Sequence, residues 1–464
     1  MSSSVYLSRR ARVAAALGAN AIAIVPTAPV QPRNRDCDFP YRHDSYFYYL
    51  SGFTEPEAWL VLRTDAAGCL HTSLFCLPKN PEREIWDGYR LGPDAAPAAL
   101  GVDDAYPTDE LDTRLPQLME NTRLLSYPFA THPGLAARME GWLGKVRARV
   151  RYGVAFPAQQ LDLCSVLDEM RLVKDAHELS LIRRACRISA NAHQRAMQTC
   201  AAMLRARRDV REYHLEAELL HAFRQNGAQF PAYGNIVAAG ANACVLHYQA
   251  GNTAIHAGDL VLIDAGCELD GYASDITRTF PAGGTFTGPQ RAIYELVLAA
   301  EEAGIAATRA GVRHNDIHDI TVRVITQGLL DLGLLDKNAG DVDAHIAQRS
   351  YFRFYMHRAG HWMGMDVHDC GSYVEPSEIS QTSTRQDALS GETIINRPSR
   401  ILRPGMVFTI EPGIYIRPAD DVPEAFWNIG VRIEDDVLVT ATGYELLTRD
   451  VPVAADAIEA LMRS

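Results

Sequence analysis

Several sequence motifs that would indicate a protein class directly are missing from this chain. The nine cysteines include no CxxC pair, which excludes a thiolate zinc knuckle and a thioredoxin-like redox site. No apolar run approaches the ~18 residues that span a membrane, and neither a Gly-rich phosphate loop nor an HExxH motif occurs. Basic residues are in the minority, because 45 Lys and Arg against 57 Asp and Glu leave a net charge of −12. Such a surface repels phosphate backbones, so the sequence predicts neither a nucleic-acid nor a membrane partner.

What remains is typical of a globular cytoplasmic protein. With 464 residues, 47% of them hydrophobic, the chain can bury two or three full-sized cores. Its cysteines are scattered singly, which fits a reducing compartment. Arg9 and Arg10 precede an apolar stretch, but Gly18 and Asn20 interrupt that stretch and no cleavage-site pattern follows. We therefore expect no signal peptide and a cytoplasmic location.

The pattern of apolar residues divides the chain into two parts. Residues 1–165 alternate helical segments with short apolar runs at 21–25, 59–62 and 73–76, which predicts an α/β domain. Residues 175–464 begin with a capping box, in which Asp175 precedes Glu178 by three positions, followed by amphipathic helices at 179–203 and 210–225. Strand-rich segments at 230–280 and 357–453 flank a helical segment at 290–334. The order helix then strand, repeated, predicts an α+β domain with pseudo-symmetric halves.

Two aspartates flank the clearest turn in the sequence. Asp270-Gly271 lies between two β-type runs and predicts a two-residue hairpin, in which Leu269 pairs with Tyr272. Extending that register places Asp264 opposite Thr277 and brings Asp275 onto the same sheet face. Two carboxylates this close repel each other unless a cation lies between them. At a solvated turn they would need no cation, and the later segments decide between these alternatives.

Further acidic residues end later strands, and histidines cluster nearby. Glu411 ends one apolar strand and Glu434 another, with Arg432 on the same strand face as Glu434. His361 lies within a span of three histidines and several glycines. If the halves are pseudo-symmetric, four carboxylates and one imidazole converge. Such an oxygen-rich set suits manganese, cobalt or magnesium, and four negative charges match two divalent cations.

These motifs resemble the pita-bread metallopeptidases, and among them most closely the Xaa-Pro aminopeptidases (aminopeptidases P). The resemblance rests on Ile-Asp-Ala-Gly at 263–266, Ser-Asp-Ile-Thr-Arg-Thr-Phe at 274–280, the histidine-rich 361–369, Glu-Pro-Gly at 411–413 and Arg-Ile-Glu-Asp-Asp at 432–436. Weaker similarity at 39–42 and 52–56 extends it to the N-terminal domain. The expected fold is an α/β N-terminal domain followed by an α+β pita-bread catalytic domain.

The resemblance also implies roles for individual residues. The five metal ligands would be Asp264, Asp275, His361, Glu411 and Glu434, holding two divalent ions, with manganese expected and cobalt or zinc as alternatives. The residues matching Asp275 and Glu434 bridge both metals in that family. Glu411 would also act as general base, and His247, His357 and His368 would line the substrate site with the support of Arg432.

The implied activity is release of the N-terminal residue from peptides with proline in the second position. A prolidase, which cleaves only Xaa-Pro dipeptides, shares the ligand set. A creatinase-like hydrolase shares the fold without those ligands, and a non-catalytic peptide-binding scaffold would keep the fold without turnover. All five ligand positions are intact here, which favours an active metallopeptidase.

Two segments lie outside these motifs. The polar residues 377–400 separate the histidine-rich segment from Glu411 and are interpreted as a surface decoration rather than a lip over the substrate channel. Trp86 would ordinarily be a core aromatic. The family's oligomers suggest instead a subunit contact, and we expect a homo-oligomer, either a dimer or a tetramer.

Overall fold

The computed structural model describes residues 4–463 and divides into two compact units, Met1–Met170 and Arg171–Ser464. Each unit is described by itself. Within the described residues no helix is both long and apolar enough to cross a membrane.

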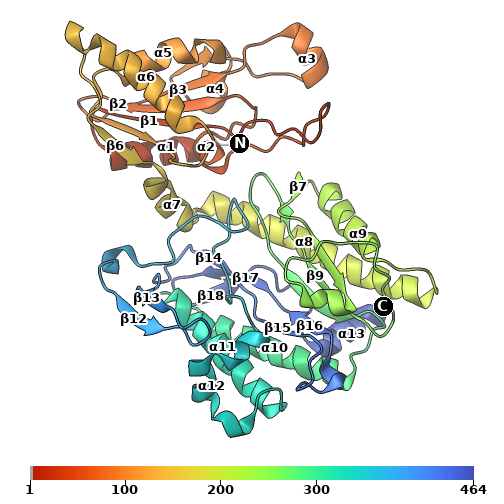
Figure 1. The fold of residues 1–464 in the computed structure, drawn as a ribbon. Coiled ribbons are helices and arrows are strands. Elements are labelled where there is room, and N and C mark those ends of the chain that lie inside the picture. The colour runs from red at the N-terminus through yellow and green to blue at the C-terminus, as the bar shows by residue number, and fades with distance from the viewer. Residues whose placement is uncertain (1–3, 464) are drawn as a thin grey trace. The chain divides into compact units, whose positions relative to one another are not determined.

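The N-terminal unit is a mixed sheet with helices (Figure 1). Its strands lie in the order β4-β3-β2-β1-β5-β6, and β1 pairs antiparallel with β2 and parallel with β5. All residues of β1 are buried, as expected of a central strand covered on both faces. The three strands predicted from apolar runs fall within β1, β2 and β3. The elements are α1 (Ser4–Leu17), β1 (Ala21–Pro26), α2 (Ser45–Ser51), β2 (Trp59–Thr64), β3 (Leu70–Cys76), α3 (Pro81–Asp87), α4 (Ala96–Leu100), β4 (Asp104–Pro107), α5 (Leu111–Met119), β5 (Leu124–Tyr127), α6 (Leu135–Arg149), β6 (Gln159–Asp162) and α7 (Cys164–Leu172).

Trp86 does not lie in the core of this unit. It belongs to the short helix α3 and is 82% exposed, next to the equally exposed Ile85 and Tyr89. The interpretation of Trp86 as a core aromatic is therefore wrong. The prediction rested on residue type, because tryptophan is usually largely buried. None of the residues of α3 is buried.

The C-terminal unit repeats one arrangement twice. The helix pair α8 and α9 accompanies the sheet β11-β9-β8, and the helix pair α10 and α11 accompanies the sheet β14-β17-β18. The elements are α8 (Ala176–Arg205), α9 (Glu212–Gln225), β7 (Phe230–Pro231), β8 (Ile236–Ala239), β9 (Leu260–Asp264), β10 (Cys267–Glu268), β11 (Thr277–Pro281), α10 (Gly288–Ala307), α11 (His314–Asp331), α12 (Val342–Gln348), β12 (Ser383–Gln386), β13 (Thr393–Asn396), β14 (Val407–Ile410), β15 (Gly413–Ile416), β16 (Ile429–Arg432), β17 (Asp435–Val439), β18 (Tyr444–Leu446) and α13 (Ala455–Arg463).

The start of α8 follows from its first residues. The Asp175 carboxylate accepts from the Glu178 backbone N–H (3.0 Å), and the Glu178 side chain accepts from the Asp175 N–H (2.9 Å). These reciprocal bonds satisfy donors that a helix end leaves without partners, so the predicted capping box is confirmed.

Several contacts join the strands of the two halves where the carboxylates gather, among them an ion pair between Arg278 of β11 and Asp435 of β17 (2.7 Å). Thr277, the first residue of β11, forms an isolated bridge with Glu434, which lies between β16 and β17. The Thr277 hydroxyl also donates to Glu434 Oε2 (2.6 Å). One hydrophobic core contains residues of both halves, from α8 at its start to α13 at its end. The strand ends of both halves therefore meet at one place.

Residues 377–400 form an exposed hairpin of β12 and β13. Arg313 holds its start through Glu378 (2.7 Å), and Arg349 pairs with Asp387 inside it. No described residue of this insertion lines the main pocket of the C-terminal unit. This placement favours a surface decoration over a lip.

The hairpin register agrees with the sequence prediction. Leu269 bridges Tyr272, and β9 pairs with β11 so that Asp264 lies opposite Thr277. Asp270 adopts a left-handed backbone (φ 51), which an Asp-Gly turn accommodates.

Gly266 allows the two arms of this hairpin to approach closely. A Cβ at this position would lie 1.7 Å from the Ser274 carbonyl oxygen. We expect Gly266→Ala to lower the free energy of unfolding by about 3 kcal/mol, because backbone must move to admit the methyl group. Gly258→Ala is the matched control, since nothing lies within 4 Å of its added Cβ. Urea unfolding measures both variants, and equal midpoints would contradict the close approach.

Candidate metal centre and active site

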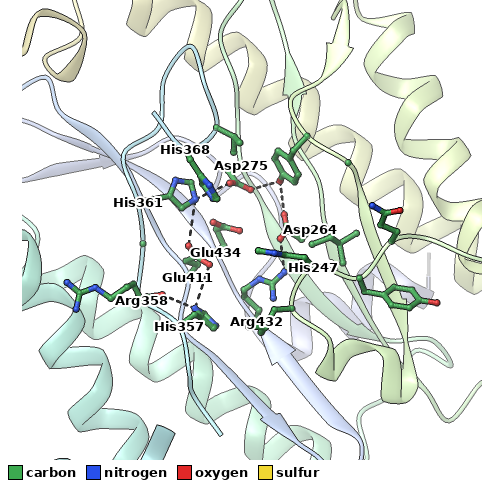
Figure 2. A pocket seen from close by; sticks show the side chains of 18 of the residues that line it. His247, Asp264, Asp275, His357, Arg358, His361, His368, Glu411, Arg432 and Glu434 are labelled. Atoms are coloured by element: carbon green, nitrogen blue, oxygen red, sulfur yellow. Dashed lines mark hydrogen bonds and ion pairs between the residues drawn. The ribbon is translucent and has the colours of Figure 1, made fainter. Parts of the chain in front are cut away.

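One pocket of about 860 Å³ in the C-terminal unit brings together every site residue predicted from the sequence. Figure 2 shows their side chains converging from both halves of the unit. The predicted residues that line it are His247, Asp264, Asp275, His357, His361, His368, Glu411, Arg432 and Glu434. The pocket also has walls that the sequence analysis did not identify, among them Tyr233, His314, Val367 and Tyr373.

The carboxylates occupy strand ends. Asp264 is the last residue of β9, and Asp275 precedes β11 on the other arm of the hairpin. Glu411 follows β14, and Glu434 connects β16 to β17. Because the strand ends of the two halves meet here, each half contributes two carboxylates.

His361 reaches the carboxylates on an extended segment beside β14. The Thr409 N–H donates to the His361 carbonyl (2.9 Å), and the Glu411 N–H donates to the Ala359 carbonyl (2.8 Å). Gly360 is required between them, since a Cβ there would lie 1.8 Å from the Thr409 carbonyl oxygen. The backbone of this segment therefore sets the place of the imidazole.

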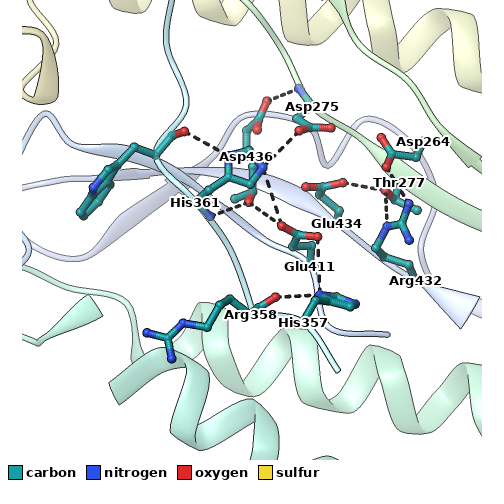
Figure 3. A network of polar contacts seen from close by, with 12 residues as sticks. Asp264, Asp275, Thr277, His357, Arg358, His361, Glu411, Arg432, Glu434 and Asp436 are labelled. Carbon is teal, nitrogen blue, oxygen red and sulfur yellow. Dashed lines mark hydrogen bonds and ion pairs between the residues drawn. The ribbon is translucent and has the colours of Figure 1, made fainter. Parts of the chain in front are cut away.

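Three side chains already present donor atoms in a metal-sized cluster. Asp275, His361 and Glu434 each offer one ligand atom, and these atoms lie within 4.8 Å of one another. His361 Nε2 is 3.5 Å from Asp275 Oδ2 and 3.7 Å from Glu411 Oε1 (Figure 3). The other ring nitrogen, Nδ1, lies 3.0 Å from the Trp362 carbonyl and donates to it. Such a bond turns Nε2 toward the metal position in metalloproteins.

The charges of this cluster do not balance within the protein. Burial raises the pKa of Glu411 to about 7, and burial with the neighbouring carboxylates raises the pKa of Asp275 and Glu434. Burial opposes protonation of His361, but its contacts with Asp275 and Glu411 raise its pKa to about 9. Buried carboxylates in this number are costly without positive charge. The donor set therefore fits divalent cations, which would supply that charge.

Arg432 is the buried cation that the protein itself provides. Its Nη2 donates to Asp264 Oδ2 (2.6 Å), its Nε to the Thr277 hydroxyl (3.2 Å) and its Nη1 to the Tyr415 hydroxyl (2.9 Å). The Thr277 hydroxyl in turn donates a hydrogen bond to Glu434 (Figure 3). One guanidinium thus orients Asp264 directly and Glu434 through Thr277.

Two further side chains hold the aspartates, and sequence reasoning missed both. The Tyr233 hydroxyl bonds to Asp264 Oδ1 (2.7 Å) and also contacts Asp275. Asp436 accepts the backbone N–H of Asp275 (3.0 Å). Tyr233 has no local sequence signal. Asp436 could have been found, because alternation along β17 places it on the same face as Glu434.

The remaining histidines surround the cluster at different depths. His357 Nδ1 lies 3.9 Å from Glu411 Oε2, and Nε2 lies 2.9 Å from the Tyr415 hydroxyl. Burial, aided by Arg432, lowers the pKa of His357 to about 4, so its ring is neutral. His368 packs edge-on against His361 with ring centroids 4.2 Å apart.

The loop that carries His361 and His368 is tied down by buried charges. Asp369 accepts from Arg171 (2.6 Å) and from Lys174 (2.9 Å), and all three side chains are 1% exposed. These cations lower the pKa of Asp369 against the effect of burial, so this carboxylate stays ionised. The loop is therefore anchored behind the pocket rather than held by the pocket residues alone.

Known proteins resemble both parts of the chain. Residues 180–441 match Metallopeptidase family M24, and residues 6–125 match the Aminopeptidase P, N-terminal domain. The Xaa-Pro aminopeptidase of Escherichia coli is 41% identical over 98% of this chain and 97% of its own length. The structure of Pseudomonas aeruginosa aminopeptidase PepP covers 100% of this chain and 98% of its own with a TM-score of 0.91 and 47% identity. Zn-substituted E. coli aminopeptidase P in complex with product gives a TM-score of 0.91, 41% identity and the same coverage.

Proposed function

Because the chain belongs to metallopeptidase family M24 and is an Xaa-Pro aminopeptidase with that family's pita-bread fold, we propose that its pocket residues divide into a two-metal ligand set and a group that holds the peptide. The enzyme releases the N-terminal residue from peptides whose second residue is proline. The full-length similarity to Xaa-Pro aminopeptidases favours this activity over prolidase. The convergence of four carboxylates with His361 in one pocket carries the proposal.

The ligand set is Asp264, Asp275, His361, Glu411 and Glu434. When bound, two divalent ions polarise the scissile carbonyl and acidify the attacking water. Four carboxylates and one imidazole favour manganese over softer choices, with cobalt or zinc as alternatives. The Nε2 of His361 and the Asp275 and Glu434 oxygens that lie within 4.8 Å support this assignment.

Glu411 acts as the general base. Its carboxylate accepts a proton from the attacking water and returns it to the proline nitrogen as the peptide bond breaks. Burial raises the pKa of Glu411 to about 7, which supports its assignment as a proton acceptor. The leaving nitrogen needs that proton, because an amine leaves as the neutral molecule and not as its anion.

The histidines hold the peptide. His247 and His368 donate to the carbonyl oxygen on which negative charge develops, an interaction that strengthens in the transition state. His357, neutral and bonded to Tyr415, fixes the wall beside Glu411. Asp264 receives the free N-terminus of the substrate, while Arg432 keeps that carboxylate in place.

Mass-spectrometric hydrolysis tests this function. The substrates are an Xaa-Pro-Pro tripeptide, the matching Xaa-Ala-Ala tripeptide and an Xaa-Pro dipeptide, each assayed after chelation and after addition of manganese, cobalt or zinc. We expect release of the first residue from the proline tripeptide only, lost on chelation and restored best by manganese. Cleavage of the dipeptide alone would indicate prolidase. Absence of turnover with bound metal confirmed by mass spectrometry would indicate a binding scaffold.

The location and assembly of the enzyme complete the proposal. Its nine unpaired cysteines fit a reducing cytoplasm. The side chains of Ile85, Trp86 and Tyr89 are exposed within five residues of one another, and exposed apolar groups of this kind are often covered by a protein partner, which supports a homo-oligomer. Multi-angle light scattering distinguishes a dimer or tetramer from a monomer, and a monomeric mass would overturn this part.

A further inference from the structure

His247 lies in the pocket, with its side chain open to the interior. Among residues 4–463 no group makes a hydrogen bond or ion pair with this imidazole, and the side chain is exposed to the pocket. His357 and His361, in contrast, each bond through a ring nitrogen to a backbone carbonyl. The position of His247 must therefore come from the backbone of its loop, residues 240–253.

Glu212 binds that loop on both sides of His247. Oε1 accepts from the Ala239 N–H (2.9 Å) and from Asn242 Nδ2 (2.9 Å), before the histidine. Oε2 accepts from the Tyr248 hydroxyl (2.9 Å) and from the Gly251 N–H (3.1 Å), after it. Each oxygen thus fixes one flank of the loop.

The carboxylate of Glu212 is fully buried. Glu212 is 0% exposed, and within the described residues no Lys, Arg or His nitrogen lies within 4.0 Å of its oxygens. It is the first residue of α9, where helix N–H groups favour negative charge. Its own backbone N–H donates to the Thr253 carbonyl (3.2 Å), so the loop is also tied to the helix. A buried ionisable group with four donors aimed at it has little freedom to move.

From these contacts we infer that Glu212 is a positioning residue for His247. Glu212 is not itself a lining residue of the pocket, although Tyr248, which donates to it, is one. It acts on the reaction by fixing the loop that presents the imidazole to the substrate carbonyl. This inference rests on the proposed role of His247. Glu212 belongs neither to the proposed metal ligands nor to the histidines that hold the peptide.

A double-mutant cycle on the full-length, metal-loaded enzyme tests the inference. Glu212→Gln keeps the shape of the side chain but turns an amide N–H₂ toward one pair of donors. We expect this change alone to lower kcat/KM for an Xaa-Pro-Pro tripeptide by about 10- to 100-fold, the effect of a misplaced catalytic group. In the His247→Ala background the same change should lower kcat/KM less than about twofold, because the group it positions is gone. Metal content should stay unchanged in all four proteins.

A merely structural role predicts a different result. Equal fold losses in both backgrounds, or no loss in the presence of His247, would overturn the inference. If His247→Ala alone left kcat/KM unchanged, the proposed role of His247 would fail first and the inference with it. Asp387→Asn is the control for loss of a loop-binding carboxylate, because Asp387 also accepts loop N–H groups, from Leu389 and Ser390, away from the pocket, although Arg349 pairs with it. Should Glu212→Gln not fold, Asn242→Ala removes one of the four donors and enters the same cycle.

Discussion

Replacing Asp275 by asparagine is expected to abolish stoichiometric metal binding and to lower kcat/KM by roughly 10³-fold or more, because activation of the attacking water depends on the metal. Asp275 contributes one of the three donor atoms that already lie within 4.8 Å of one another. Asparagine removes a negative charge and leaves an amide that binds divalent cations weakly. Metal content by mass spectrometry and hydrolysis of an Xaa-Pro-Pro tripeptide measure both effects.

The same substitution should stabilise the metal-free protein. Without cations the buried carboxylates repel one another, and burial with Asp264 raises the pKa of Asp275. Removing one charge relieves that repulsion, so we expect a higher thermal midpoint for apo Asp275→Asn than for the apo parent. Asp270→Asn, at the tip of the same hairpin, is the control for both measurements. Full metal content in Asp275→Asn would contradict its assignment as a ligand.

We expect Arg432→Met to lower both the stability of the protein and its affinity for metal, because Arg432 orients the ligand Asp264. Methionine fills much of the same space but leaves the half-buried Asp264 without its 2.6 Å ion pair to the buried Arg432. Loss of one partner of a buried pair costs about 3–5 kcal/mol of stability, and loss of a group that orients ligands lowers metal affinity about 10- to 100-fold. Urea unfolding and calorimetric titration with manganese measure these effects.

A matched surface arginine separates the two contributions. Arg323 is 57% exposed and pairs with Asp343, so Arg323→Met removes an equal charge with little effect on either quantity. If Arg432→Met bound manganese as tightly as the parent, the guanidinium would have no part in orienting Asp264. Arg432 would then contribute to the stability of the protein but not to metal binding.

Local sequence rules predicted the parts of the site that depend on near neighbours. The Asp-Gly turn fixed the pairing of Asp264 with Thr277 because strand register has a period of two, and a shift by one residue would send both aspartates to the opposite face. The capping box at Asp175 likewise located the start of α8. In both cases the determining residues are only a few positions apart.

Contacts between distant segments escaped prediction. Tyr233 meets Asp264 only because β7 and the hairpin arms lie together in the folded unit, and nothing around Tyr233 in the sequence marks it. Glu212 is equally unmarked as the first residue of an ordinary amphipathic helix. Trp86 failed for the opposite reason, since residue type predicts average burial but not whether an element packs on its own domain.

The bridge between Thr277 and Glu434 has a consequence for biosynthesis. Of the five assigned ligands Glu434 is translated last, and its partner Thr277 belongs to the other half of the catalytic unit. A ribosome-bound chain that has exposed Asp264, Asp275 and His361 therefore still has an incomplete set of ligands. Because the ligand set is complete only once both halves have been translated, we expect hydrolysis to begin only after the whole catalytic unit has been synthesised.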